Sequence, residues 1–381
     1  MRIGGASVAT GLWLALGLSA GVGAQTAPSE ALTAALPQVC AGAQRELALR
    51  CAALSPAGAS AFSLAAAAQR LEELPGHARV GDLQGDDART PAASPQSAWQ
   101  LWASALHGSL DRREGRIEAG FDAARDGFAV GAGWQPSAAW VVDGGWQWAR
   151  EDLDYRASDG RLRARLDGPV VAVAWMPSDA WRLEAHADRS AGRFESRRRV
   201  RYTLPGGEAI DSDAHARTRT ERRGAGLALR RSDAFGSVSL DSGFGIDDSR
   251  TRIGAYLESG GAGWALAVPS RERRSRRAQL DVAISTALSR DTGVWLPSAR
   301  LVAVREFDDA SRTLTVRFVD DGGETPVRFA TEEPDDHWLD AALGLVWVRP
   351  GGAAFFVEAR QRIGHRFLRE RQVALGLRLE R

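Results

Sequence analysis

The chain has 381 residues, a formal net charge of +1 and 25% charged residues. A balance this close to neutral argues against nucleic acid as a main partner. The mean hydropathy of -0.26 does not exclude a membrane protein, because a membrane β-barrel needs apolar residues only at every second position in the middle of each strand.

Residues 1–24 have the pattern of a secretory signal peptide. Arg2 precedes an apolar run over residues 8–18, and small residues follow at 22–24. The run is shorter than the roughly 20 residues that cross a bilayer as a helix, and no other apolar run of that length is present. We therefore expect an exported chain without a membrane helix.

Residues 25–75 are rich in alanine and leucine and predict a short helical segment, broken at Pro37, Gly42 and Pro56. Cys40 and Cys51 are the only cysteines. On one continuous helix they would lie about 16 Å apart, too far for a disulfide, but a turn near Gly42 would let them meet. In an oxidising compartment we expect a disulfide that contributes about 2 to 3 kcal/mol. Two free thiols or a metal pair are the alternatives, although no neighbouring histidine completes a metal site.

Residues 76–97 are rich in Gly, Asp, Pro and Ser and predict a flexible linker. From residue 98 to 381, segments alternate apolar and polar side chains. Over Trp181–Asp188 every odd residue is apolar and every even one is charged or ionisable. Since successive strand side chains point to opposite faces, each such strand has one apolar face and one polar face. Together with export, this pattern favours an outer-membrane barrel over a soluble sandwich.

The turns allow the strands to be counted. Five short turns indicate twelve antiparallel strands, with longer connections at the opposite, outer end. The short turns are expected at residues 135–138, 176–179, 231–234, 289–292 and 349–352. The longer connections are expected near residues 112–125, 156–162, 204–213, 259–269, 308–334 and 364–367. The fold class is therefore all-β, a 12-stranded antiparallel transmembrane β-barrel preceded by a short α-helical segment.

Several tryptophans lie next to the short turns, at the same alternate positions of their strands as the apolar residues. They predict a periplasmic aromatic girdle, in which amphipathic rings lie between headgroups and hydrocarbon. The residues are Trp134, Trp140, Trp175, Trp181 and Trp347.

At the opposite ends of the strands, arginines occupy these same outward-facing positions on four neighbouring strands. Arginine is too costly at mid-membrane, so these side chains must lie above the hydrocarbon. They either contact lipopolysaccharide phosphates or are solvated and paired with nearby glutamates, and the sequence leaves both readings open. The residues are Arg193, Arg197, Arg199, Arg201, Arg217, Arg219, Arg223, Arg250, Arg252, Arg274 and Arg276.

The alternate positions that face inward carry both acidic and basic side chains. These side chains can neutralise one another in the lumen through hydrogen-bonded ion pairs. It suits a narrow pore or a plugged one. The residues expected in the lumen are Asp143, Arg182, Glu184, His186, Asp188, Glu358, Arg360 and Arg362.

From about residue 99 to the end, the chain resembles the C-terminal translocator barrel of autotransporters. The resemblance rests on the order and spacing of several segments, among them AWQLWASALHGSL, DGFAVGAGW, GRFESRRRVRYTLPGG, PDDHWLDAALGL and QVALGLRLER. It implies a twelve-stranded barrel in the outer membrane of a Gram-negative bacterium that serves secretion of an N-terminal passenger. It implies no cofactor and no catalytic residues.

The chain departs from this pattern in two ways. Between Ala24 and Ala98 only 73 residues are available for a passenger, without β-helix repeats or an enzyme-like domain. The helices could therefore fill the pore or fold below it. Barrels of this kind usually end in an aromatic residue that the barrel assembly machinery recognises, whereas this chain ends in Arg381.

We expect an autotransporter-type barrel, a monomer in contact with outer-membrane lipids and lipopolysaccharide. It would translocate or display its short N-terminal segment, or act as an orphan structural barrel. The alternatives are a small-solute pore plugged by its helices and an outer-membrane hydrolase. The hydrolase is disfavoured because the possible acid–base groups show no recognisable catalytic arrangement. These groups are Asp335 and Asp336 beside His337, Asp247 beside Asp248, and His186 with Ser190. We expect no enzyme, cofactor or metal site.

Overall fold

The structure, a computed structural model, describes residues 28–53, 99–115, 120–156, 159–203, 208–308, 313–331, 333 and 335–380. The expected signal peptide (1–24), the linker (76–97) and the helix break at Pro56 lie outside the described residues. No described helix is both long and apolar enough to cross a membrane.

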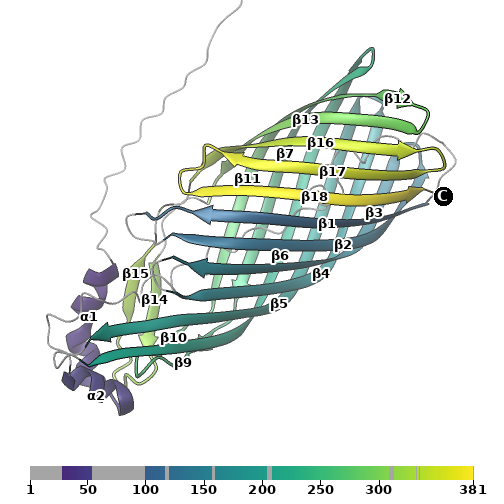
Figure 1. Cartoon of the computed structure of the whole chain (residues 1–381). Helices are drawn as coiled ribbons and strands as arrows, with labels where there is room; N and C mark the ends of the chain where they lie inside the picture. The colour runs from purple at the N-terminus through teal and green to yellow at the C-terminus, as the bar shows by residue number, and fades with distance from the viewer. Residues whose placement is uncertain are drawn as a thin grey trace, which may run out of the picture.

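Twelve long strands form one closed antiparallel barrel (Figure 1). The sheet closes because β1 pairs with β18 along its length and β11 pairs with β13. The barrel strands are β1 (Trp99–Arg112), β2 (Phe121–Ser137), β3 (Trp140–Tyr155), β4 (Arg161–Ser178), β5 (Trp181–Thr203), β6 (Ala209–Phe235), β7 (Val238–Ile253), β11 (Arg271–Thr286), β13 (Gly293–Glu306), β16 (His337–Arg349), β17 (Ala353–Ile363) and β18 (Leu368–Glu380).

Four of the five short turns lie within a few residues of their predicted positions. The turn predicted at residues 231–234 is wrong, because β6 continues to Phe235 and the chain reverses at Gly236 and Ser237. Ser232 stays in the strand and donates to Asp241 across the hairpin. Gly236 has φ of 66°, which suits glycine at the first central position of a tight hairpin turn.

The strand ends opposite the short turns carry small additional elements. The barrel connections there contain β8 (Tyr256–Leu257), β9 (Ser259–Gly260), β10 (Leu266–Val268), β14 (Thr313–Phe318) and β15 (Val327–Ala330), whereas β12 (Leu288–Arg290) lies in a short turn. Strands β15, β14, β10 and β8 form a separate four-stranded sheet. Strands β5 and β6, of 23 and 27 residues, extend toward this sheet, well beyond the roughly 10 residues that cross a bilayer.

The main hydrophobic core lies at this outer end. It joins inward-facing residues of the barrel wall, such as Phe121 and Phe194, to residues of the small sheet, such as Val316 and Phe329, all fully buried. Lower in the barrel, glycines make room for aromatic rings. A Cβ at Gly131 would lie 2.2 Å from the indole of Trp102, so only glycine fits there.

Two helices precede the barrel, α1 (Pro28–Gly42) and α2 (Arg45–Ala53). The break expected at Pro37 is wrong, because α1 continues through this proline. An internal proline costs about 3 kcal/mol, and the burial of Val39 on the same helix against the outer core offsets part of that cost. The break expected at Gly42 is present.

Candidate functional site: the outer mouth of the barrel

The two helices lie at the end of the barrel that carries the long connections, beside β9, β10, β14 and β15 (Figure 1). Cys40 of α1 and Cys51 of α2 form the expected disulfide, with their Cα atoms 5.4 Å apart. The helices therefore neither fill the pore nor fold below it. They form, with the small sheet, a unit that we call the cap (residues 28–53, β8, β10, β14 and β15).

Backbone hydrogen bonds attach the helices to the connection that follows β14. The amide of Gln44 donates to the carbonyl of Asp320 at 2.7 Å, and the amide of Gly322 donates to the carbonyl of Gly42 at 2.8 Å. A Cβ at Gly42 would lie 2.3 Å from a carboxylate oxygen of Asp321, so this close approach requires glycine.

Apolar contacts complete the attachment. Val39 and Leu47 are fully buried in the same core as Trp264 and Phe318, whose rings meet edge to face at 5.3 Å. The sequence could not reveal this docking, because the partners of the helices lie more than 200 residues further along the chain.

A buried ion pair fixes the cap to the barrel wall. The guanidinium of Arg198 on β5 donates to both carboxylate oxygens of Glu258, at 3.2 and 2.5 Å, and to the carbonyl of Trp264 at 2.7 Å. Glu258 also accepts the amide of Leu266 at 2.9 Å. Arg198 and Glu258 are almost completely buried, at 1% and 6% exposure. Every charge is hydrogen-bonded, as a buried pair requires.

The barrel begins at the opposite end from the cap. Trp99, the first residue of β1, pairs with Trp134 beside the short turn at Ala138, and the neighbouring Gln100 pairs with Glu380 near the end of β18. The chain that joins Ala53 to Trp99 therefore has to connect the two ends of the barrel.

Side chains of both signs lie on the inward faces of the strands and pair with one another. The sequence-identified residues have these partners: Asp143 accepts Gln100 (3.0 Å), Arg182 contacts Glu184 (2.8 Å), His186 contacts Asp247 (3.3 Å), Asp188 contacts Arg222 (2.9 Å), Glu358 contacts Arg360 (3.0 Å), and Arg362 contacts Asp340 (3.2 Å) and Glu370 (2.9 Å). Glu370, which also binds Arg125 at 2.6 Å, was missed by sequence reasoning.

The loop between β17 and β18 holds a buried histidine above these pairs. The ring of His365 lies 5.4 Å from Trp338, and its Nδ1 accepts the amide of Leu368 at 3.1 Å and lies 3.0 Å from Asp335. Burial, reinforced by Arg362, Arg277 and Arg112, lowers the pKa of His365 to about 3. The ring is therefore neutral at physiological pH.

The sequence profile of the autotransporter beta-domain matches residues 101–360. The chain belongs to the autotransporter β-domain family. Its fold is similar to the translocator domain of autotransporter NalP from Neisseria meningitidis, with a TM-score of 0.60 at 12% identity over 78% of this chain and 94% of that one. It is also similar to the beta domain of the Bordetella autotransporter BrkA, with a TM-score of 0.51 at 13% identity over 74% of this chain and all of that one. No curated protein sequence matches the chain.

Membership of the autotransporter β-domain family places the barrel in the outer membrane of a Gram-negative bacterium. Short turns of such barrels face the periplasm and the longer connections face the outside. The outward face carries an exposed apolar band, of which Val142, Val171, Leu227 and Phe244 are examples. On β3 the band runs from Trp140 to Trp148, about 20 Å in height for a strand tilted by roughly 40°.

The five tryptophans expected in the girdle lie on this outward face near the periplasmic turns. Trp134, Trp140, Trp175 and Trp181 are 40 to 44% exposed. Trp347 is less exposed because it stacks between Trp295 and Phe355, at centroid distances of 5.3 and 5.6 Å. The sequence reading missed Trp99, Trp295 and Phe355, although each occupies an outward position beside a periplasmic end.

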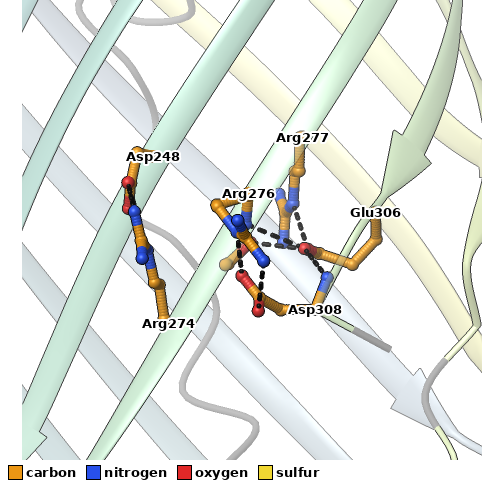
Figure 2. Close-up of polar contacts among 7 residues, drawn as sticks. Asp248, Arg274, Arg276, Arg277, Glu306 and Asp308 are labelled. Carbon is orange, nitrogen blue, oxygen red and sulfur yellow. Dashed lines mark hydrogen bonds and ion pairs between the residues drawn. The ribbon is translucent and has the colours of Figure 1, made fainter. Parts of the chain in front are cut away.

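Seven of the eleven arginines considered for lipopolysaccharide contact are paired with carboxylates of the protein. Figure 2 shows Arg274 against Asp248 (Nε–Oδ1 3.1 Å) and Arg276 against Asp308 (2.9 Å), beside the inward pair Arg277–Glu306 (3.0 Å). The other pairs are Arg197–Asp213 (2.6 Å), Arg199–Asp211 (2.6 Å), Arg201–Asp159 (2.7 Å), Arg217–Glu195 (3.3 Å) and Arg223–Glu221 (2.9 Å). Within the described chain, the other four, Arg193, Arg219, Arg250 and Arg252, make no direct ion pair.

The possible acid–base groups lie far from a catalytic arrangement. Asp335 and Asp336 lie beside different histidines, His365 and His337, and Asp247 lies beside His186 inside the barrel. In the described part of the chain, no group of three or more His, Cys, Asp or Glu side chains could hold a metal ion.

Proposed function

We propose that this autotransporter barrel exports its own N-terminal segment and retains it as a folded cap on its outer loops. The single observation that carries the proposal is the position of the disulfide-linked helices at the outer end, whereas β1 begins at the periplasmic end. The passenger is then residues 28–53, and the barrel that carried it also holds it.

The composition of the joining segment supports a route through the lumen. Residues 54–98 contain Asp82, Asp86, Asp87 and Arg89, which would be costly in hydrocarbon if the segment crossed outside the barrel. The polar, ion-paired inner wall offers a route without that cost. The segment is long enough, since its extended length of about 150 Å exceeds the roughly 90 Å contour of β6, the longest strand.

The contacts of the cap favour retention over release. Val39 and Leu47 are buried in a core shared with the barrel wall, and the amide of Gln44 is bonded to Asp320. This same core occupies the outer mouth, which argues against an open solute pore. We also propose that the barrel is a monomer and that the barrel assembly machinery inserts it.

Surface labelling of intact cells tests the proposal. The chain contains no lysine, so Leu49→Lys, at a residue of α2 that is 70% exposed, introduces a unique side-chain amine for a membrane-impermeant amine reagent. Arg366→Lys in the outer loop is the positive control, and Arg290→Lys in a periplasmic turn is the negative control. The label is mapped by peptide mass spectrometry, which separates it from the N-terminal amine.

We expect Leu49→Lys and Arg366→Lys to be labelled on intact cells, and Arg290→Lys only after the outer membrane is permeabilised. Labelling of Arg366→Lys without Leu49→Lys would place the helices inside the cell envelope and overturn the proposal. Recovery of residues 28–53 in the culture medium instead of on the cells would overturn retention.

A further inference from the structure

Three unpaired arginines on the outward face of the barrel form a row across adjacent strands. The row continues to Arg150 of β3, the direct neighbour of Arg165, but Arg150 is paired with Asp152 at 2.5 Å. Arg165 of β4 is the direct cross-strand neighbour of Arg193 of β5, which in turn is the neighbour of Arg219 of β6. All three are exposed. None of them makes an ion pair or a side-chain hydrogen bond within the described chain.

The rows on either side are neutralised by the protein itself. In the next row outward, Arg163 contacts Asp152 at 2.5 Å and Arg217 contacts Glu195 at 3.3 Å. In the rows toward the periplasm, Glu221 contacts both Arg189 and Arg223, at 2.8 and 2.9 Å. Arg250 and Arg252 also lack a direct ion pair, but Arg250 lies between the paired Arg223 and Arg274, and Arg252 lies between Glu221 and Glu272. Three adjacent unpaired arginines are therefore not a general property of this surface.

Such a row is unfavourable without a counterion. Directly opposed residues of an antiparallel pair have Cβ atoms about 5 Å apart, and like charges at that spacing destabilise the sheet. Three consecutive guanidinium groups thus raise the free energy of the isolated barrel and would be neutralised by an anion bridging them.

The row lies just above the apolar band. On β4, Pro169 and Val171 belong to the band and Asp167 is the first polar outward residue, so Arg165 stands two residues further out. Two residues along a tilted strand correspond to about 5 Å in height. This is the height of the lipid headgroups in the outer leaflet. On β6 the first polar outward residue is Arg223 and Arg219 stands four residues further out, so the row rises to about 10 Å above this edge at Arg219.

We propose that Arg165, Arg193 and Arg219 form a binding site for the phosphate groups of a phosphorylated glycolipid of the outer leaflet, the lipid A part of lipopolysaccharide. Guanidinium forks bind phosphate oxygens bidentately, and a row about 10 Å long, two spacings of about 5 Å, can contact one phosphate with two neighbouring arginines. The site replaces most of the broader set of arginines first considered, because those are already paired with carboxylates.

Lipid binding to the detergent-purified full-length protein tests the site. Native mass spectrometry with bisphosphorylated lipid A is compared among the unmodified protein, the variant Arg165→Gln/Arg193→Gln/Arg219→Gln, and the variant Arg197→Gln/Arg199→Gln/Arg201→Gln. The last removes the same charge from three ion-paired arginines. Folding of each variant is checked by heat-modifiable electrophoretic mobility.

We expect the row variant to bind lipid A about tenfold more weakly, from the loss of three exposed charge contacts, and the control to lose little. Dephosphorylated lipid A should bind the unmodified protein and the row variant alike. In zwitterionic detergent alone, the row variant should melt at the same temperature or higher, because repulsion is removed, whereas lipid A should stabilise only the unmodified protein and the control. Equal losses in both triple variants, or binding that ignores the lipid phosphates, would overturn the site.

Discussion

Arg198 and Glu258 form an ion pair that is almost completely excluded from solvent, with a closest N–O distance of 2.5 Å, where the wall of the barrel meets its cap. The pair joins Arg198 of the long strand β5 to Glu258, which directly follows the short strand β8. It couples the position of the cap to the barrel wall through charge as well as through the shared core.

Removing one partner of this pair should loosen the cap. Arg198→Ala or Glu258→Ala leaves one buried charge alone, and each change should destabilise the cap by about 3 to 5 kcal/mol. Hydrogen exchange at the amide of Leu266, which Glu258 accepts, measures the opening. The double change Arg198→Met/Glu258→Leu should cost less than the sum of the single changes. Additive costs would show that the two charges act independently.

The disulfide should stabilise the docked helices. Closing a loop of this length is worth about 3 kcal/mol by the chain-entropy relation. Cys40→Ala/Cys51→Ala should therefore increase hydrogen exchange at Gln44, whose amide binds Asp320. Exchange within β1–β3 in the membrane should not change. Unaltered protection at Gln44 would mean that the packing of Val39 and Leu47 alone holds the helices.

Gly131 tests the packing of the barrel interior, and Gly144, on the outward face of β3, is its control. A Cβ at Gly131 would lie 2.2 Å from Trp102, whereas a Cβ at Gly144 would meet no atom within 4 Å. Gly131→Ala should reduce the fraction of folded barrel, measured by heat-modifiable mobility, and Gly144→Ala should not. Similar folding of the two variants would contradict the inward position of the Trp102 ring.

The buried His365 should make the outer loops sensitive to acid. Its folded pKa of about 3 lies below its usual value of 6.5. Between these values the unfolded chain binds a proton that the folded protein does not, so stability falls as the pH drops from 6.5 toward 3. His365→Asn should flatten this dependence in urea unfolding of the lipid-inserted protein. The same change at His337, whose side chain is 78% exposed, is the control, and an equal effect there would contradict the assignment.

The barrel could be read from the sequence because its strands follow a period of two over most of the chain. Trp181–Asp188 identifies both faces of β5 without any structural information. The Cys40–Cys51 pairing could also be predicted, since only two cysteines are present. The turn after β6 was misplaced because Ser232 and Asp233 carry turn-forming side chains, yet they remain in the ladder.

Contacts between residues far apart in the chain could not be predicted from this alternation. The docking of Leu47 near Trp264 and the pairing of Arg198 with Glu258 depend on how the outer connections fold over the mouth. Likewise, Arg197 and Arg219 both occupy outward-facing positions, so the sequence alone does not distinguish them. Only the register shows that Asp213 neutralises the first, whereas the second stands beside Arg193.

A membrane barrel of this kind requires that one face of each strand touches hydrocarbon. Ala185 lies outward in the apolar band, paired with Val173 and Leu227, and the adjacent His186 faces inward against Asp247. The fraction of barrel that folds into outer-membrane lipid, measured for Ala185→Arg and His186→Arg, tests this most directly. Arginine at the outward position should cost about 2 to 4 kcal/mol and block insertion, whereas arginine at the inward position should pair with Asp247 and be tolerated. Equal insertion of the two variants would contradict the assignment of the faces.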